Sequence, residues 1–338
     1  MRAAGLSLCL GALAQVPAVA PTGGIWSAGD GFTFKDQEKK TRRAVSGIAC
    51  APNARQQTVC LLAFDEGVVM QFARLGDNRL KPDGPGLVLG RAGQELDAEG
   101  AATDGDYFYL TGSHAVKRQS CAANPASQHV LRFRRDTQTG QTGQTATAMD
   151  LRDAGHLLKL IAALPELQPY AGPGHCLGSG GIDIEGLAVR RGRLFFGLRG
   201  PTEADAAFIV SVDAKAFFDG ADAKPKLSRV KVGPGRSLRD MVAVSDGVLL
   251  LAGPDDAERN AGLPWQVLHW NDATEGPNAA TPKPLAVLAL GSVARRKCDK
   301  EIKPEAMTVL AEGAKAYRLL VLSDGMCDGG AMAFDIPR

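Results

Sequence analysis

The chain has 338 residues, of which 45% are hydrophobic and 22% are charged, and this composition excludes a disordered chain. The charges nearly cancel, at +2, so there is no overall field to attract nucleic acid or an anionic membrane. Forty glycines and nineteen prolines, spread along the chain, favour many short strands joined by tight turns over a helical bundle. We therefore expect an all-β fold.

The amino terminus has the features of a secretory signal peptide. Met1 and Arg2 precede an apolar stretch that ends in the small-x-small triplet 12–14. A second triplet, 18–20, is followed by Pro21, so we predict a signal peptide over residues 1–14; the alternative is an ordinary buried strand or helix. No later stretch reaches the roughly 18 apolar residues of a membrane span. We expect an exported protein, periplasmic or extracellular, whose folded domain covers residues 22–338.

An internal repeat organises the rest of the chain. Residues 97–113 and 183–199 match in one ungapped register, each with a short strand, a turn at Gly105 or Gly192, and an aromatic-rich second strand. Weaker copies begin at 46, 239 and 304, and most units continue into a third strand, such as residues 130–134, 208–212 and 267–270. Repeated sheets of about four strands are typical of a β-propeller. We predict five blades, with six or seven as the alternative.

Two segments fall outside this repeat. Residues 31–34 precede the first unit, and we expect such an amino-terminal strand to complete the last blade and remove an exposed sheet edge. Residues 150–167 carry apolar side chains at helical spacing with Asp150 at the N-cap position, which predicts one inserted helix packed against the propeller.

The repeat also predicts a site. The first strand of a blade starts on the face where the second strand ends, so residues at these two points converge from every blade. The strand starts are predicted to bring together Ser46, Glu99, Glu185, Asp240 and Glu305, and the strand ends Asp65, Ser113 with His114, Arg199, residues 253–254 and Asp324. Asp97 and Asp183 lie two residues before a Glu, and alternate strand residues point to one side.

Crowded carboxylates repel unless a cation or an arginine compensates them. Arg199, Arg239 and Lys303 are the internal candidates, and calcium is the external one, because it prefers oxygen ligands. We therefore predict ligand or metal binding by eight acids: Asp65, Asp97, Glu99, Asp183, Glu185, Asp240, Glu305 and Asp324. The alternative is that these acids accept hydrogen bonds from neighbouring blades and only hold the ring closed.

Seven cysteines become six once Cys9 is assigned to the signal peptide, and six suit three disulfides in an oxidising compartment. The repeat places the six in local pairs, Cys50 with Cys60, Cys121 with Cys176, and Cys298 with Cys327, although buried free thiols are the alternative. The short basic runs 39–43 and 295–297 are interpreted as solvated loops.

These motifs resemble a bacterial family described as domain of unknown function 3616 and, more distantly, the esterase-like phytase propellers. The resemblance rests on residues 97–100 (Asp-Ala-Glu-Gly), 111–114 (Thr-Gly-Ser-His), 181–188, 197–201, 238–240 (Leu-Arg-Asp) and 251–254, which span nearly the whole mature chain. It implies a propeller. The phytase-like relatives suggest hydrolysis of phosphate or carboxylic esters.

Three functions follow as expectations. The first is a monomer that binds a divalent cation or a small polar or anionic ligand on its acidic face. The second is a metal-assisted ester hydrolase, in which Arg199 orients an anionic substrate and His114 relays protons. The third is a scaffold for protein interactions, which predicts a large exposed apolar patch.

Overall fold

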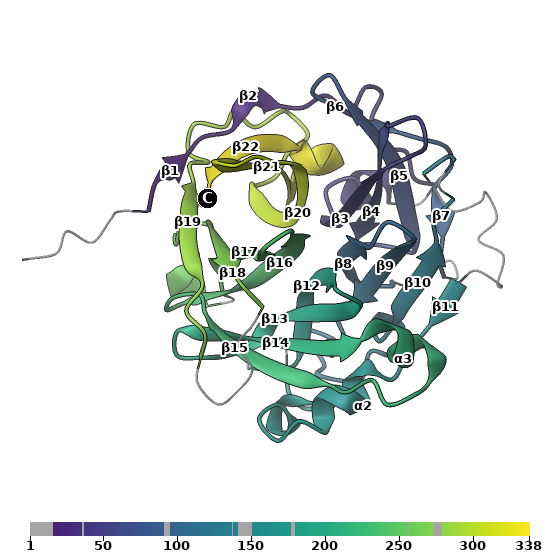
Figure 1. The fold of residues 1–338 in the computed structure, drawn as a ribbon, viewed down its shortest axis with the longest axis vertical. Coiled ribbons are helices and arrows are strands. Elements are labelled where there is room, and N and C mark those ends of the chain that lie inside the picture. The colour runs from purple at the N-terminus through teal and green to yellow at the C-terminus, as the bar shows by residue number, and fades with distance from the viewer. Residues whose placement is uncertain are drawn as a thin grey trace, which may run out of the picture.

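Five β-sheets stand around one axis in the computed structural model (Figure 1). The structure describes residues 16–35, 37–90, 95–136, 138–140, 151–176, 180–255, 257–272 and 279–338. The predicted signal peptide, residues 1–14, lies outside the described residues. The sheets form a five-bladed β-propeller, which confirms the predicted fold class and blade number.

Each blade is built from strands that follow one another along the chain. Blade 1 contains β3 (Val45–Pro52), β4 (Thr58–Phe64), β5 (Val69–Gly76), β6 (Arg79–Pro82) and the short β7 (Leu87–Val88). Blade 2 contains β8 (Ala98–Thr103), β9 (Tyr107–Gly112), β10 (Val130–Arg134) and β11 (Leu151–Asp153). Blade 3 contains β12 (Asp183–Arg190), β13 (Arg193–Glu203), β14 (Ala206–Asp213) and β15 (Lys226–Lys231).

The last two blades include strands from the amino-terminal segment. Blade 4 contains β16 (Arg236–Val244), β17 (Gly247–Pro254), β18 (Gln266–Trp270) and β19 (Lys283–Leu288), with β1 (Ala18–Val19) parallel to β19. Blade 5 contains β20 (Lys303–Glu312), β21 (Ala316–Asp324), β22 (Met332–Pro337) and β2 (Thr22–Ile25).

The core lies between the blades. Five clusters of buried apolar residues fill the five interfaces between neighbouring sheets of the described chain. In β17, Val248 and Leu250 pack toward blade 3, whereas Leu249 and Leu251 pack toward blade 5. Alternate strand residues point to opposite faces, and both faces are covered here, which explains why such strands read as continuous apolar runs.

An amino-terminal strand completes blade 5, as predicted, but residues 31–34 do not form it. The closing strand is β2, which pairs with β22 at Ala333 and Met332 and lies beside it in Figure 1. Phe32 and Phe34 instead pack on Phe64, with ring centroids 6.0 and 5.1 Å away, in the cluster between blades 5 and 1. Burial of these two rings outweighs their tendency to form a strand.

Three short α-helices complete the description: α1 (Glu38–Thr41), α2 (Leu157–Ala162) and α3 (Ala214–Asp219). Four single turns of 3₁₀ helix accompany them: η1 (Pro125–Ser127), η2 (Gln168–Tyr170), η3 (Glu258–Asn260) and η4 (Cys327–Gly330). Among the described residues, no helix has the length and apolar character that a membrane crossing requires.

The inserted helix is shorter than predicted, and a second helix was missed. Residues 151–153 form the outer strand of blade 2, so α2 begins only after His156, and Asp150 lies outside the described residues. Helix α3 begins after Asp213, whose side chain accepts a hydrogen bond from the Ala216 amide, and ends at Gly220 in the left-handed conformation. Asp213 and Gly220 are sequence signals that could have predicted this helix.

Candidate functional site

A β-bulge opens the first strand of every blade. In each case the pairing with the second strand skips one residue, and the skipped residues are Ser46, Glu99, Glu185, Arg239 and Glu305. A bulge leaves its extra residue out of the ladder and re-aims its side chain. The residue after the Glu of blades 2 and 3 is a glycine, because a Cβ on Gly100 would lie 2.8 Å from the Leu187 Cβ of the next blade. In the repeated Glu-Gly pair, the glutamate therefore points into the centre of the propeller and the glycine allows the neighbouring blades to pack closely.

The bulges correct the predicted repeat register in blade 4. Arg239, not Asp240, is the counterpart of Glu185 there. Asp240 is 1% exposed, and its carboxylate accepts hydrogen bonds from the amides of Met241, at 2.7 Å, and Met307, at 2.5 Å. A shift of one residue moves a strand side chain to the opposite face, so Asp240 joins blade 4 to blade 5 and does not enter the central site.

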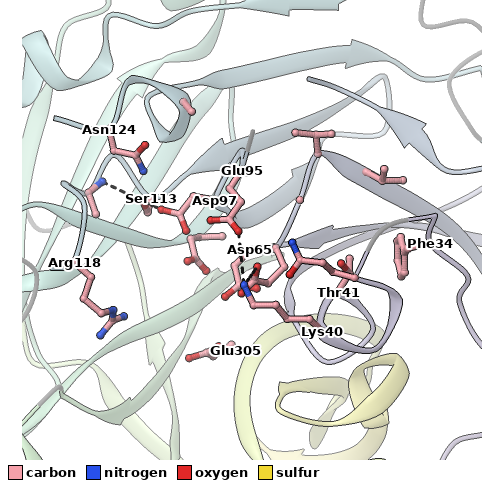
Figure 2. Close-up of a pocket in the computed structure, with 18 of the residues that line it drawn as sticks. Phe34, Lys40, Thr41, Asp65, Glu95, Asp97, Ser113, Arg118, Asn124 and Glu305 are labelled. Carbon is pink, nitrogen blue, oxygen red and sulfur yellow. Dashed lines mark hydrogen bonds and ion pairs between the residues drawn. The ribbon is translucent and has the colours of Figure 1, made fainter. Parts of the chain in front are cut away.

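A cavity of about 1480 Å³ lies where the inner ends of the blades meet (Figure 2). Most of the predicted site residues line it: Asp65, Asp97, Glu99, Asp183, Glu185, Arg199 and Glu305. Asp324 does not line the cavity. Its carboxylate lies 2.7 Å from the ammonium nitrogen of Lys303, and Lys303 does line the cavity. Both the strand start and the strand end line the cavity in blades 2 and 3, whereas blade 1 contributes only its strand end, Asp65, and blade 5 only its strand start, Glu305.

On one side of the cavity, the negative charges of Glu185 and Glu305 are balanced by cationic side chains of the protein, as the sequence suggested. Arg199 Nη1 lies 2.5 Å from Glu185 Oε1, and Arg239 Nη1 lies 3.2 Å from one oxygen each of Glu185 and Glu305. Lys303 Nζ lies 3.1 Å from Glu305 Oε1. Glu185 and Arg239 are 2% and 3% exposed. These pairs place three cations against the acids of blades 3 and 5.

Two neighbouring carboxyls on this side have opposite pKa shifts. Burial favours the neutral form of Glu185, but Arg199, Arg239 and Lys303 outweigh it and lower the pKa. Burial, followed by the charge of Glu185, raises the pKa of Glu305 to about 7, against the opposing effect of Lys303 and Arg239. Near neutral pH, Glu185 is therefore ionised and Glu305 exchanges its proton readily.

On the other side of the cavity, the acids Asp65, Asp97 and Glu99 form no such ion pairs within the described chain. Asp97 accepts a hydrogen bond from the Ser113 hydroxyl. Within the described chain, Glu99 has no ion pair or hydrogen-bond partner, and Asp65 Oδ1 is buried without a partner. Burial raises the pKa values of Asp65, Asp97 and Glu99, and the neighbouring acids raise them further.

His114 does not reach the cavity. It is 2% exposed, its Nδ1 lies 3.0 Å from the Gly112 carbonyl oxygen, and burial lowers its pKa to about 4. Ser113 lines the cavity, whereas His114, whose backbone is in the left-handed conformation (φ 57°) after the end of β9, lines a separate pocket of about 30 Å³ beside Tyr170. The predicted proton relay through His114 is therefore not supported by its position.

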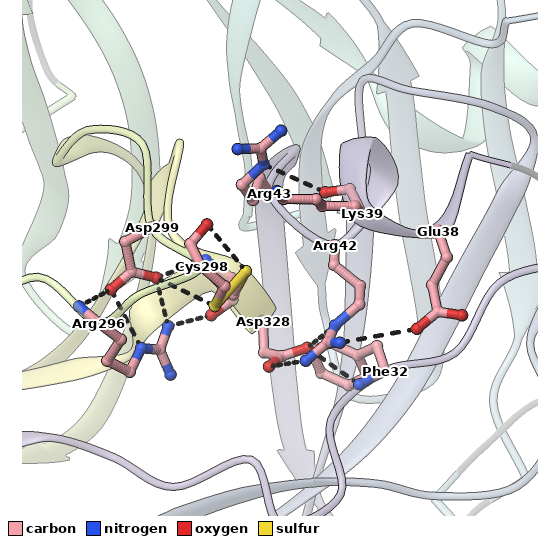
Figure 3. Close-up of a disulfide and its surroundings, with 10 residues drawn as sticks. Phe32, Glu38, Lys39, Arg42, Arg43, Arg296, Cys298, Asp299 and Asp328 are labelled. Carbon is pink, nitrogen blue, oxygen red and sulfur yellow. Dashed lines mark hydrogen bonds and ion pairs between the residues drawn. A yellow bond between two sulfur atoms is a disulfide. The ribbon is translucent and has the colours of Figure 1, made fainter.

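All three predicted disulfides are present. Cys50 and Cys60 face each other across β3 and β4, with Cα atoms 4.0 Å apart. Cys121 and Cys176 join two loops, with Cα atoms 4.7 Å apart. Cys298 and Cys327 join the segment before β20 to η4 (Figure 3), with Cα atoms 6.0 Å apart.

The basic runs are less solvated than the sequence suggested. Arg42 donates hydrogen bonds to both oxygens of Asp328, at 2.8 and 2.7 Å (Figure 3). Arg296 is likewise held by Asp299. Lys40 lines the cavity, where its ammonium group contacts Glu66 and lies 3.7 Å from Glu95. Sequence reasoning missed Glu66 and Glu95, because neither residue occupies a position that recurs in the repeat.

The family model described as "Protein of unknown function (DUF3616)" matches residues 83–139 and 125–329. No curated protein matches the chain.

Several solved structures are similar to the chain in outline. A glycosyl hydrolase from Bacteroides ovatus is 8% identical, with 95% of this chain and 94% of that chain covered and a TM-score of 0.48. A putative glycoside hydrolase from Bacteroides ovatus is 10% identical, with coverages of 95% and 97% and a TM-score of 0.49. An exo-β-1,3-galactanase from Clostridium thermocellum is 10% identical, with coverages of 94% and 62% and a TM-score of 0.49. At these values the likeness carries no argument about function.

Proposed function

The chain belongs to the DUF3616 family of proteins of unknown function, and from the chemistry of its cavity we propose that it binds a small polar ligand there. The observation that carries the proposal is a cavity of about 1480 Å³ in which, within the described chain, Asp65 Oδ1 is buried without a hydrogen-bond partner and Glu99 forms no ion pair. Ligand pockets are commonly concave sites of this order of size with a few converging polar groups. Half-buried acids without partners cost folding free energy when they are ionised, and a ligand that compensates their charge recovers it.

Thermal denaturation with a library of small polar compounds tests this proposal. A bound ligand raises the melting temperature in a concentration-dependent way, because it binds the folded state only. The variant Glu99→Gln is expected to weaken the response, whereas Glu258→Gln, on the exposed turn η3, is expected to leave it unchanged. A response that is identical in all three proteins would place the ligand elsewhere.

A divalent cation is the simplest form of this ligand, but the spacing of the carboxylates favours a larger molecule. In the part of the chain that the structure describes, the three-residue group with ligand atoms within 4.8 Å of one another is Cys298, Asp299 and Cys327, and it includes no acid of the cavity. Calcium takes six to eight oxygen ligands at about 2.3–2.6 Å. Calorimetric titration with calcium distinguishes the two forms, and heat that disappears in Glu99→Gln would favour the ion.

A hydrolase is the second candidate, and the opposed pKa shifts of Glu185 and Glu305 favour it. Pairs of acids with diverging pKa values are typical of acid–base catalysis. Glu305, with a pKa of about 7, can donate a proton to a leaving oxygen, and Arg199 can orient an anionic group. Turnover of phosphate or carboxylic esters that is lost in Glu305→Gln would support this function. Loss on addition of a chelator would add the metal requirement, and no turnover over a broad panel would argue against it.

An interaction scaffold has less support. That function predicted a large apolar patch, and Val88, 63% exposed, is the single exposed large hydrophobic residue of the described chain.

Export and a monomeric state complete the proposal. Three disulfides suit an oxidising compartment outside the cytoplasm. Mass spectrometry of the protein from a secreting host should give a mature chain that begins after Ala14. Such a chain keeps Pro17 and Val19, whose carbonyls accept hydrogen bonds from the amides of Val287 and Ala289, both at 2.8 Å. Size-exclusion chromatography tests the monomer.

A further inference from the structure

The five bulged residues form a ring around the axis, in the order Ser46, Glu99, Glu185, Arg239 and Glu305, because the first strands of successive blades contact one another and β20 contacts β3. Arg239 lies between two acids of this ring and donates hydrogen bonds to both, Glu185 and Glu305. Ser46 holds the corresponding place between Glu305 and Glu99, and it brings no charge. The negative charges of the ring are therefore balanced by a cation of the ring on the side of Arg239 and not on the side of Ser46.

The uncompensated side is also the one where further acids gather. Asp65 follows β4 of the same blade as Ser46, and Figure 2 shows it between Asp97 and Glu305. The charges of Asp324 and Glu305 act on Asp65, and its Oδ1 is buried without a partner in the described chain. Lys40 lies at the edge of this region. Its ammonium group is held by Glu66 and Glu95, and Asp65 acts on it only through its charge, with no ion pair between them.

We propose that the ligand carries an ammonium or guanidinium group, and that this group lies between Asp65 and Glu99 as the guanidinium of Arg239 lies between Glu185 and Glu305. This inference rests on the proposed function and names the chemical class of its ligand. An organic cation fits better than a metal ion because its donors are spread over several ångströms, and a guanidinium can bridge carboxylates that are too far apart to share one ion. The cavity has room for the remainder of such a molecule.

Isothermal titration of the full chain with four probes tests the inference: agmatine, putrescine, inositol and inorganic phosphate. Agmatine or putrescine is expected to bind, at least tenfold more weakly to Glu99→Gln than to the wild type, and with unchanged affinity to Glu258→Gln. Binding of inositol or phosphate without binding of either amine would overturn the inference and leave the proposed function standing. Silence of all four probes would overturn the inference and count against the proposed function as well.

A gain-of-charge variant provides an independent measurement. Ser46→Arg supplies a built-in guanidinium at the uncompensated place in the ring. It is expected to raise the melting temperature of the ligand-free protein and to weaken amine binding at least tenfold. Amine binding at full strength by a folded Ser46→Arg protein would contradict the proposed location. If this variant does not fold, the same location is tested by Asp65→Asn, for which at least tenfold weaker amine binding is expected.

Discussion

Arg239 in blade 4 donates hydrogen bonds to both carboxylate oxygens of Glu185 in blade 3, at 3.3 and 3.2 Å. Both side chains are buried, so removal of this cation would leave Glu185 with Arg199 and Glu305 with Lys303 as the remaining partners, and each acid would lose one ion pair in a buried site. We expect Arg239→Met to lose about 3–5 kcal/mol of unfolding free energy, measured by urea denaturation. Arg236→Met, on the same strand, is the control, because Arg236 donates to the Pro264 carbonyl. Equal losses in both variants would show that the ion pairs at the floor contribute little.

Asp240 should behave as a structural residue. Asp240→Ala leaves the buried amides of Met241 and Met307 without their acceptor, at a cost of about 1–3 kcal/mol for an unsatisfied group. The loss should be the same with and without ligand, and ligand affinity should not change. Calorimetry of the variant checks this point, and a large drop in affinity would return Asp240 to the site.

Glu305 should make stability depend on pH. Its pKa is about 7 in the folded chain and 4.5 in the unfolded one, so the folded state binds more protons between these values and stability falls as pH rises. Each pKa unit corresponds to about 1.4 kcal/mol. The lowered pKa of Glu185 acts below 4.5, outside this window. Urea denaturation at pH 5 and pH 8 should show a smaller difference for Glu305→Gln than for the wild type; an equal or larger difference would contradict the assignment.

The disulfides should contribute unequally. Cys121 and Cys176 are 55 residues apart and Cys50 and Cys60 are 10 apart. A longer closed loop restricts the unfolded chain more, which predicts losses of about 4 and about 3 kcal/mol on removal. Thermal denaturation of the two paired Cys→Ser variants measures the difference. The reverse order would indicate that packing around Cys50, and not chain entropy, dominates.

The blades and most of the residues that line the cavity could be predicted from the order of amino acids along the chain. Runs such as Val248 to Leu251 must bury both faces, and a chain of such strands repeated five times has few arrangements other than a closed ring. The strand ends at Asp65, Arg199 and Asp324, and the three cysteine pairs, followed from that repeat.

Which of two neighbouring residues faces the axis depends on contacts between blades and could not be predicted from the chain alone. The segment Leu238–Arg239–Asp240 reads equally well in two registers one residue apart, because it has no glycine after the acid to mark the bulge. Which register forms depends on contacts with the next blade, where the Met307 amide donates a hydrogen bond to Asp240, so that Arg239 pairs with the acids of the ring. Long-range packing likewise places Phe32 and Phe34 in an interface between blades. In β16, a register shift of one residue exchanges the side chains that face the axis and the neighbouring blade, and this shift cannot be read from local sequence.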